Sequence, residues 1–255
     1  MGLPDDNADM MATEGQDHYD ALGRSHWYLV GRYRLTLAMC RDHFPADGWI
    51  VDVGCGPGCL MEELPDHDRL LGVDLAARAL SYAKAAGHER LTRANVLQLP
   101  FATDSMPFVF AQDIIEHIVE DQQGLSELGR VLKPGGCLFV CVPAFELLRG
   151  KHDDLFGHQR RYRVHEIRAK IQRAGLRVLK ISYVQALFFP MLLVFRYWKN
   201  LAGSEACDFK PMKGPFNAFL TWLVALERHW LRISQMPFGC NIMCVARKPE
   251  RRAGA

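Results

Sequence analysis

Three glycines in the segment VDVGCGPGCL, residues 51–60, could hold a ligand close to the backbone. An apolar run that reads as a buried strand precedes them, and Gly54, Gly56 and Gly58 then alternate. Glycine reaches turn conformations that other residues rarely adopt, and it lets a ligand approach the main chain. The dinucleotide fingerprint G-x-G-x-x-G is incomplete because Cys59 takes its sixth position. The Lys and Ser/Thr ending of a phosphate-binding P-loop is absent as well.

Two carboxylates accompany this turn. Asp52 lies on the predicted strand 49–54, and Asp74 ends the next predicted strand, 70–75. A carboxylate at the end of the second strand of an α/β unit can accept hydrogen bonds from both hydroxyls of a ribose. A tight turn with an incidental surface aspartate is the alternative. The glycine turn after one strand and Asp74 at the end of the next strand together favour a ligand that contains a ribose.

His117 follows the predicted strand 107–113 and could take a proton from an acceptor. It closes the segment DIIEH, and histidine is the side chain whose unperturbed pKa lies near neutrality. A well-placed base accelerates proton-coupled transfer roughly 10²- to 10⁴-fold. A histidine at a helix start, bonded to Glu116 or to backbone, explains the same residue equally well, so both interpretations stay open.

The segment HDDLFGHQRRYR, residues 152–163, follows the predicted strand 137–143 and gathers further candidates. His158 could accept a proton, and Arg161 could hold an anionic group through two parallel hydrogen bonds. Tyr162 could stack on an acceptor or donate a hydrogen bond to it. A solvated basic loop is the alternative, and it suits the other arginines of the segment better than these three residues.

Apolar runs that read as strands alternate with helical patterns along the chain. The predicted strands are 49–54, 70–75, 90–96, 107–113, 137–143, 176–184 and 239–248. The predicted helices include 76–87, 123–136 and 165–175. This alternation predicts an α/β fold with a parallel sheet whose ligand lies at the carboxyl ends of the strands.

Length and composition narrow the class of protein. The 255 residues are 49% hydrophobic, which suits one core of ordinary size with a smaller appendage. The formal charge is only +2, so we expect no nucleic-acid partner. The eight cysteines form no zinc-knuckle spacing, and we interpret them as reduced thiols of a cytoplasmic protein.

The chain divides into five predicted parts. Residues 1–18 are polar and acidic without an apolar signal region, which predicts a disordered tail. Residues 19–44 predict a helical cap, 45–184 the α/β core, and 185–237 a helical insertion. Residues 238–248 then supply the last strand of the core sheet.

The ordered motifs of the core resemble those of a known family. VDVGCGPG resembles motif I of class I S-adenosylmethionine-dependent methyltransferases, of the type 11/23 branch. GVDL, ANVLQLPF, DIIEH and ELGRVLKPGGCLFVCVP follow in the order typical of that family, over residues 45–145. The resemblance implies a Rossmann-like fold with seven mostly parallel strands, helices on both faces, and S-adenosylmethionine as the cofactor.

The resemblance also implies roles for individual residues. Asp52 would face the ammonium of the cofactor, Asp74 its ribose and Leu75 its adenine. Asn95 stands where the family has an aspartate that accepts from the adenine amino group, and an amide oxygen can do the same. The implied cofactor-binding set is Asp52, Gly54, Cys55, Gly56, Gly58, Asp74, Leu75, Asn95, Val96 and Gln112.

The triplet HWY, residues 26–28, resembles an aromatic cap of the family over the cofactor. It makes Trp27 and Tyr28 candidate substrate contacts, although simple helix packing explains Trp27 equally well. Related ubiquinone-type O-methyltransferases carry a divalent-ion site in the segment that DIIEH resembles. Asp113, Glu116 and His117 match that pattern only partially, and we expect no metal.

The predicted insertion contains two long apolar patterns, ALFFPMLLVFRYW and FNAFLTWLVALERHWLRI, within residues 186–233. The first is too short to cross a bilayer, and the second has helical spacing. A lid over an apolar substrate, a homodimer face and a peripheral membrane contact all fit this pattern. We favour the lid, with ordinary packing against the core contributing to it.

The leading functional hypothesis is a methyltransferase for a small, partly apolar acceptor, with oxygen as the favoured receiving atom and sulfur or nitrogen as alternatives. A second hypothesis is methylation of a lipid or polyprenyl-linked glycan at a membrane surface. A third is a non-catalytic, cofactor-binding module that regulates a partner. The identity of the methylated product would distinguish the first two, and turnover of the cofactor would exclude the third.

Overall fold

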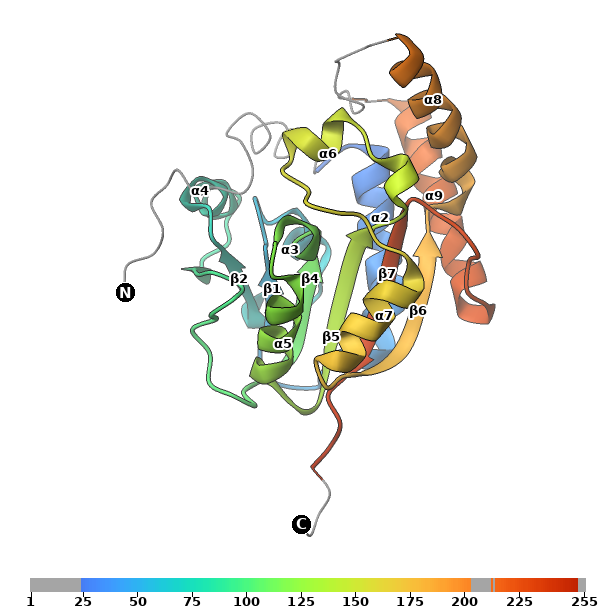
Figure 1. Cartoon of the computed structure of the whole chain (residues 1–255). Helices are drawn as coiled ribbons and strands as arrows, with labels where there is room; N and C mark the ends of the chain where they lie inside the picture. The colour runs from blue at the N-terminus through green and yellow to red at the C-terminus, as the bar shows by residue number, and fades with distance from the viewer. Residues whose placement is uncertain (1–23, 203–211, 213, 252–255) are drawn as a thin grey trace.

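A computed structural model of the protein describes residues 24–202, 212 and 214–251. The predicted tail 1–18 and the first residues of the predicted cap lie outside the described residues. Strands and helices are labelled as in Figure 1. The strands are β1 Ile50–Val53, β2 Leu70–Asp74, β3 Leu91–Arg93, β4 Met106–Gln112, β5 Leu132–Pro143, β6 Arg177–Val184 and β7 Asn241–Arg247.

All of these strands form one sheet in the order β3-β2-β1-β4-β5-β7-β6. β7 runs antiparallel to both of its neighbours, and the other pairs are parallel. The predicted α/β fold with seven mostly parallel strands is thereby confirmed. The central strands read as continuous apolar runs because helices cover both faces of the sheet.

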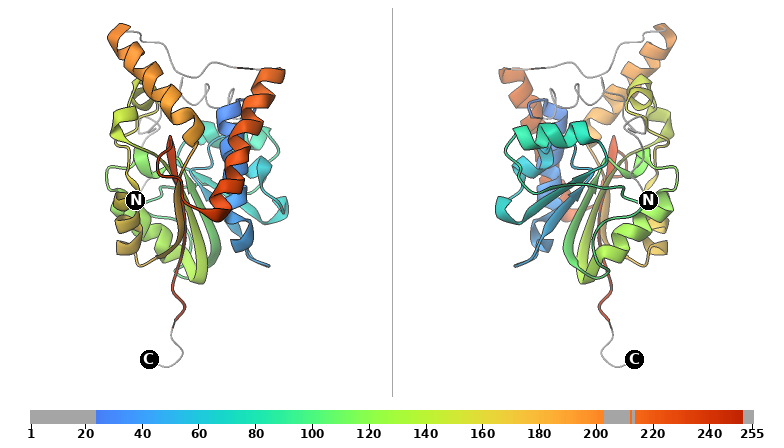
Figure 2. Two further views of the ribbon diagram at one scale, coloured as in Figure 1. Left: turned by 90° about the vertical axis from the view of Figure 1, so that its right-hand side faces the viewer. Right: turned by 90° about the vertical axis from the view of Figure 1, so that its left-hand side faces the viewer.

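The helices lie on the two faces and at the upper edge of this sheet. They are α2 Trp27–Cys40, α3 Cys59–Glu63, α4 Ala77–Ala85, α5 Asp121–Val131, α6 Lys151–Leu155, α7 Val164–Arg173, α8 Phe189–Ala202 and α9 Pro215–Ile233. α5 and α7 cover one face, and α2 and α9 cover the other (Figures 1 and 2). Each face has its own apolar core, with Leu125 and Ile167 in one and Leu35 and Val224 in the other.

Three sequence-predicted boundaries differ from the structure. The strand predicted at 90–96 ends at Arg93, because the following residues turn back toward β2. The helix predicted at 123–136 ends at Val131, and 132–136 belong to β5. The amide of Lys248 donates to the carbonyl of Gly136, so pairing along the strand prevails over the turn signal there. The segment 152–163 begins with the short helix α6 rather than a continuous loop.

α9 packs against α2, and Gly31 makes this close approach feasible. A Cβ atom at Gly31 would lie 2.7 Å from the Cβ of Val224, which no ordinary contact allows. The amides of Gln185 and Leu187 donate to the buried carboxylate of Glu227 on α9, at 2.6 and 3.1 Å. The predicted insertion is therefore anchored firmly to the cap helix and to the end of β6.

Candidate active site

A pocket opens at the carboxyl edge of the sheet, where β1, β2, β4 and β5 end. The glycine turn after β1 and the end of β2 form one wall. The opposite wall comes from the short 3-10 helix Ile115–His117 (η4), the segment that follows α6, and side chains of α2 and α8. Most of the residues predicted to bind the cofactor therefore share one cavity with both predicted bases, His117 and His158.

The glycine turn is fixed by hydrogen bonds to the end of β2. The amides of Gly54 and Cys55 both donate to the carbonyl of Val73, at 2.7 and 3.0 Å. The amide of Gly56 donates to Oδ2 of Asp74 at 2.8 Å, and the amide of Ala76 donates to Oδ1 at 2.9 Å. Asp74 is thus held rigidly at the pocket wall, and a carboxylate oxygen can accept more than one hydrogen bond.

Gly56 borders open space. No atom lies within 4 Å of the position a Cβ would occupy, and its φ of +54° is in the left-handed region. The turn itself thus leaves room for a side chain at this position. A side chain at Gly56, which lines the pocket, would project into space that a ligand could fill, and the positive φ would add strain.

Asp52 is the buried carboxylate at the base of the pocket. Asp52 is only 3% exposed, and it lines the pocket. Burial, together with the negative charges of Asp74 and Asp113, raises the pKa of Asp52 to about 7. A buried carboxylate of this kind favours a positively charged ligand, since such a charge would stabilise its ionised form. The residue therefore fits the cationic part of S-adenosylmethionine.

The predicted cofactor set divides into two groups. Those that line the pocket are Asp52, Gly54, Cys55, Gly56, Asp74, Leu75 and Gln112. Gly58, Asn95 and Val96 do not line it. Gly58 precedes α3 with a φ of +83°, and the side chain of Asn95 accepts from the amide of Leu97 at 2.9 Å. The turn after β3 thus uses the amide oxygen of Asn95 for a local hydrogen bond.

One buried carboxylate organises the wall of the pocket that was predicted to meet the acceptor. Asp153 on α6 is fully buried and accepts from Nε and Nη2 of Arg161, at 2.8 and 3.1 Å. It also accepts from Nη1 of Arg196 on α8 at 3.2 Å, and its Oδ1 lies 2.8 Å from Nδ1 of His158. Although burial alone would raise it, these hydrogen bonds and charges lower the pKa of Asp153 well below its ordinary value. We call Asp153, Arg161, Arg196 and His158 the acceptor cluster.

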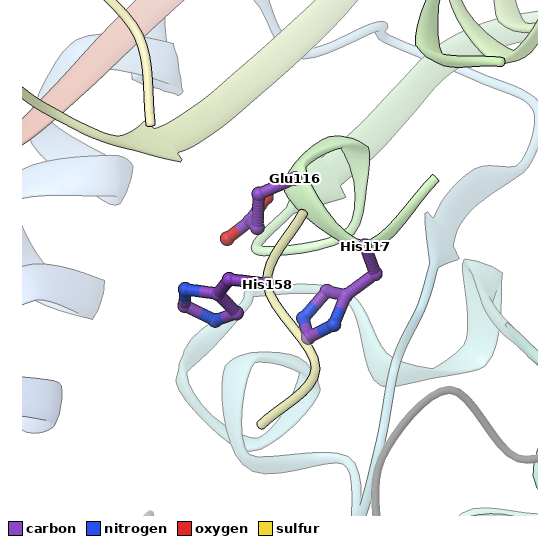
Figure 3. Close-up of side chains that lie close together, drawn as sticks. All are labelled: Glu116, His117 and His158. Atoms are coloured by element: carbon purple, nitrogen blue, oxygen red, sulfur yellow. The ribbon is translucent and has the colours of Figure 1, made fainter. Parts of the chain in front are cut away.

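The acceptor cluster orients the ring of His158. Nδ1 of His158 lies 2.8 Å from Oδ1 of Asp153, and the neutral tautomer that donates to this carboxylate carries its lone pair on Nε2. His117 lies beside it, with ring centroids 4.8 Å apart at a near-perpendicular angle (Figure 3). Burial, as the larger cause, and the proximity of the His158 ring lower the pKa of His117 to about 3. His117 is therefore a neutral and weak base, and His158 is the better placed of the two predicted bases.

Glu116 completes a small group of polar side chains around these histidines. Glu116, His117 and His158 each bring a ligand-type atom to within 4.8 Å of the others (Figure 3). Burial and the charge of Asp113 raise the pKa of Glu116 well above its ordinary value, which favours the neutral acid. Asp113, the first acid of DIIEH, instead bonds Nη1 of Arg32 at 3.0 Å. Asp113, Glu116 and His117 therefore do not come together as the ligands of one divalent ion; the residues that converge are Glu116, His117 and His158.

The other candidate substrate contacts take different places. Tyr28 lines the pocket, and its hydroxyl accepts from the amide group of Asn241 at 2.7 Å. Trp27 packs on Phe188 outside the pocket lining. The hydroxyl of Tyr162 donates to Asp121 at 2.8 Å, within the core beneath the opposite face of the sheet. The structure therefore directs Arg161 into the pocket and Tyr162 away from it.

Three residues of the site escaped the sequence interpretation. Arg32 on the cap helix and Arg196 on α8 line the pocket, and Asp153 on α6 is buried behind the lining residues Arg161 and His158. Asp153 lies five residues before His158 in a segment already singled out. The presence of a carboxylate so close to a candidate base was the signal that could have identified it. Arg196 is the one charged residue within the apolar pattern 186–198, which was a second signal. Nothing local distinguished Arg32 from its neighbours.

The core matches known methyltransferases. A sequence model of the methyltransferase domain family matches residues 51–140. The ubiquinone/menaquinone biosynthesis C-methyltransferase of Geotalea daltonii is 28% identical over 145 residues, which cover 51% of this chain and 62% of the relative. The ubiquinone biosynthesis O-methyltransferase of Rhizobium rhizogenes is 25% identical over 152 residues, covering 49% and 61%. The chain thus spans less than two thirds of these relatives.

The fold agrees with this match over most of the chain. A SAM-dependent methyltransferase from Archaeoglobus fulgidus superposes with a TM-score of 0.58 at 14% identity, covering 91% of this chain and 99% of that structure. Among the described residues, no helix is both long and apolar enough to span a bilayer. The motifs, the pocket at the carboxyl edge and the matching relatives identify residues 51–140, within the α/β core, as a class I S-adenosylmethionine-dependent methyltransferase domain.

Proposed function

We propose that this protein transfers a methyl group from S-adenosylmethionine to a small acceptor that carries an anionic group and an apolar part. Oxygen is the favoured receiving atom. The acceptor cluster is the observation that carries the proposal. It gathers two arginines and a histidine around one buried carboxylate, and these three side chains line the same pocket as Asp52 and Asp74.

The charges of the acceptor cluster favour an anionic acceptor. Two permanent positive charges, Arg161 and Arg196, share the single negative charge of Asp153. Arg161 uses three of its five N–H groups in hydrogen bonds to Asp153 and to the carbonyl of Ala144. Its planar fork therefore retains donors for a carboxylate or phosphate oxygen. Phe156 and Leu192 line the same pocket and would contact the apolar part.

His158 would remove the proton that an acceptor hydroxyl loses on methylation. Asp153 orients its ring through Nδ1, so Nε2 is the atom that accepts this proton. The bound cofactor supplies a methyl group already activated on a sulfonium sulfur. The protein's part is then to align the acceptor, which is worth ~7–11 kcal/mol in favourable cases, and to exclude water. A hydroxyl is favoured over a tertiary amine as the acceptor, because the hydroxyl has a proton for this base to remove and the tertiary amine has none.

The test compares transfer with cofactor binding. We expect His158→Ala and Arg161→Ala to lower methyl transfer at least tenfold while the Kd for S-adenosylmethionine, measured by calorimetry, stays within about threefold. His165→Ala and Arg173→Ala, on the exposed side of α7, are matched controls that should transfer normally. Normal turnover by both pocket variants would refute the acceptor assignment. The absence of any turnover by the unaltered chain, with intact cofactor binding, would favour the non-catalytic alternative.

A further inference from the structure

Two helix ends rise beyond the carboxyl edge of the sheet and expose apolar side chains. They are the C-terminal half of α8 and the N-terminal half of α9, and they stand apart from each other in both views of Figure 2. The exposed fractions of six side chains there run from 46% for Phe195 to 66% for Trp198. We call these side chains the helix tips: Val194, Phe195, Trp198, Phe216, Phe219 and Trp222.

The spacing shows that each tip is one face of its helix. Phe216, Phe219 and Trp222 recur every third residue along α9, and Val194, Phe195 and Trp198 share one side of α8. The faces that point inward are different ones. α8 turns Leu192 and Arg196 toward the pocket, and α9 buries Val224 against α2. The tips are therefore additional apolar surfaces, not the parts of these helices that hold the core together.

This orientation argues against a lid whose apolar face closes on the substrate. On α8 the side that meets the pocket carries Arg196, and the apolar residues of the tip face solvent. Two separate tips also make a poor partner for a rigid protein surface, which needs one contiguous complementary patch. A fluid apolar phase has no such requirement. Exposed tryptophans are also the residues that settle at a membrane–water interface.

Charge points in the same direction. Residues 186–233 contain six Lys or Arg and three Asp or Glu. Arg196 and Glu227 are both buried, so the other charged residues of this segment are five basic and two acidic ones. Positive charge beside an exposed apolar surface attracts a bilayer that contains anionic lipid. We infer that the helix tips insert into the interfacial layer of an anionic lipid bilayer. Because α8 borders the pocket on its other side, this docking would bring the pocket close to the lipid surface.

Docking would explain how a partly apolar acceptor reaches the acceptor cluster. An amphiphile in the bilayer could extend its anionic head group toward Arg161 and Arg196 while its apolar part remains near the tips. This source of the acceptor rests on the proposed function, whereas the docking itself does not. The two are therefore tested by different measurements.

The test is flotation of the full chain with vesicles of two compositions, phosphatidylcholine alone and phosphatidylcholine with 30% phosphatidylglycerol. We expect the protein to float with the anionic vesicles, and less with the neutral ones or at 0.5 M NaCl. The double variant Trp198→Asp/Phe219→Asp should lower the ratio of bound to free protein at least tenfold. Calorimetry with S-adenosylmethionine shows whether that variant retains its fold and its cofactor pocket.

Two exposed tryptophans outside the tips serve as matched controls. Trp49 precedes β1 at the opposite edge of the sheet, and Trp230 lies near the C-terminal end of α9. Trp49→Asp and Trp230→Asp should float like the unaltered chain. No binding to anionic vesicles, or equal binding by the tip variant, would overturn the inference. So would a stable dimer in light scattering that the tip variant dissociates, since the tips would then form a protein interface. If the unaltered chain binds the vesicles but transfers no methyl group, that result would count against the proposed function alone.

Discussion

Asp52→Asn should stabilise the cofactor-free protein at pH 8 and leave it nearly unchanged at pH 4. The reason is the pKa of about 7 that burial and the charges of Asp74 and Asp113 impose on this carboxyl. An unfolded aspartate ionises near pH 4, so ionisation favours the unfolded chain from there up to about pH 7. The stability that the neutral acid contributes is therefore present below pH 4 and lost as the pH rises to 7.

The size of the effect follows from the gap of about three pKa units, each worth about 1.4 kcal/mol. The unaltered protein should lose up to about 4 kcal/mol through this group by pH 8. Asparagine has nearly the same shape and does not titrate. The free energy of unfolding of Asp52→Asn should therefore exceed that of the unaltered chain by about 3 kcal/mol more at pH 8 than at pH 5. The titrations of Asp113 and Glu116 are present in both proteins and largely cancel in the comparison.

Urea unfolding of both cofactor-free proteins at pH 5, 6.5 and 8 measures this difference. The same variant should bind S-adenosylmethionine more weakly at pH 8, because the ionised carboxylate is what attracts a cation. The affinity of the unaltered chain should correspondingly rise from pH 6 to pH 8, and that of the variant should not. A stability difference that stays constant with pH would refute the reasoning about Asp52.

Three further predictions follow from the pocket and its supports. Asp74→Ala should weaken binding of S-adenosylmethionine by ~1.5–3 kcal/mol, about 10- to 150-fold, in calorimetry, and unchanged affinity would remove Asp74 from the site. Gly31→Val should lower the free energy of unfolding by ~1–3 kcal/mol, because the added side chain meets Val224; a neutral effect in urea titration would mean that α9 is free to shift. Treatment with EDTA should leave methyl transfer intact, since the sulfonium needs no Lewis acid; loss with EDTA and recovery with magnesium would show that Glu116, His117 and His158 hold an ion.

The parts of the site that sequence reasoning located are those with local signals. The glycine turn and Asp74 lie at the ends of two neighbouring parallel strands, so their meeting follows from the alternation of strands and helices. Strand pairing also fixes the register, with Asp52 opposite Gly72, two residues before Asp74. A short apolar run followed by a tight turn was therefore enough to predict the wall of the pocket that the glycine turn and Asp74 form.

The acceptor side depends on contacts between distant segments. Asp153 and Arg196 are 43 residues apart and meet only because α8 folds back over α6. The sequence interpretation of Tyr162 overlooked the alternation of side chains along an extended segment. Tyr162 lies in an extended segment bridged to Ala144, where successive side chains point to opposite sides. With Arg161 in the pocket, Tyr162 had to face the other way.

Burial likewise decided between the two candidate histidines. His117 and His158 are indistinguishable by residue type, and both follow predicted strands. Only the structure shows that His158 is oriented by an ionised carboxylate and that burial keeps His117 neutral. Asn95 is a similar case, because its amide is used by the turn after β3.

Transfer of a labelled methyl group tests the central claim most directly. The full chain would be incubated with S-adenosylmethionine labelled in its methyl group and with a combined extract of small metabolites and membrane lipids, and the labelled product identified by mass spectrometry. The account predicts one labelled acceptor that carries an acidic group and an apolar part, formed by the unaltered chain and by His165→Ala but not by Asp74→Ala or His158→Ala. Transfer that persists unchanged in Asp74→Ala and His158→Ala, or no transfer at all from a chain that binds the cofactor, would contradict it.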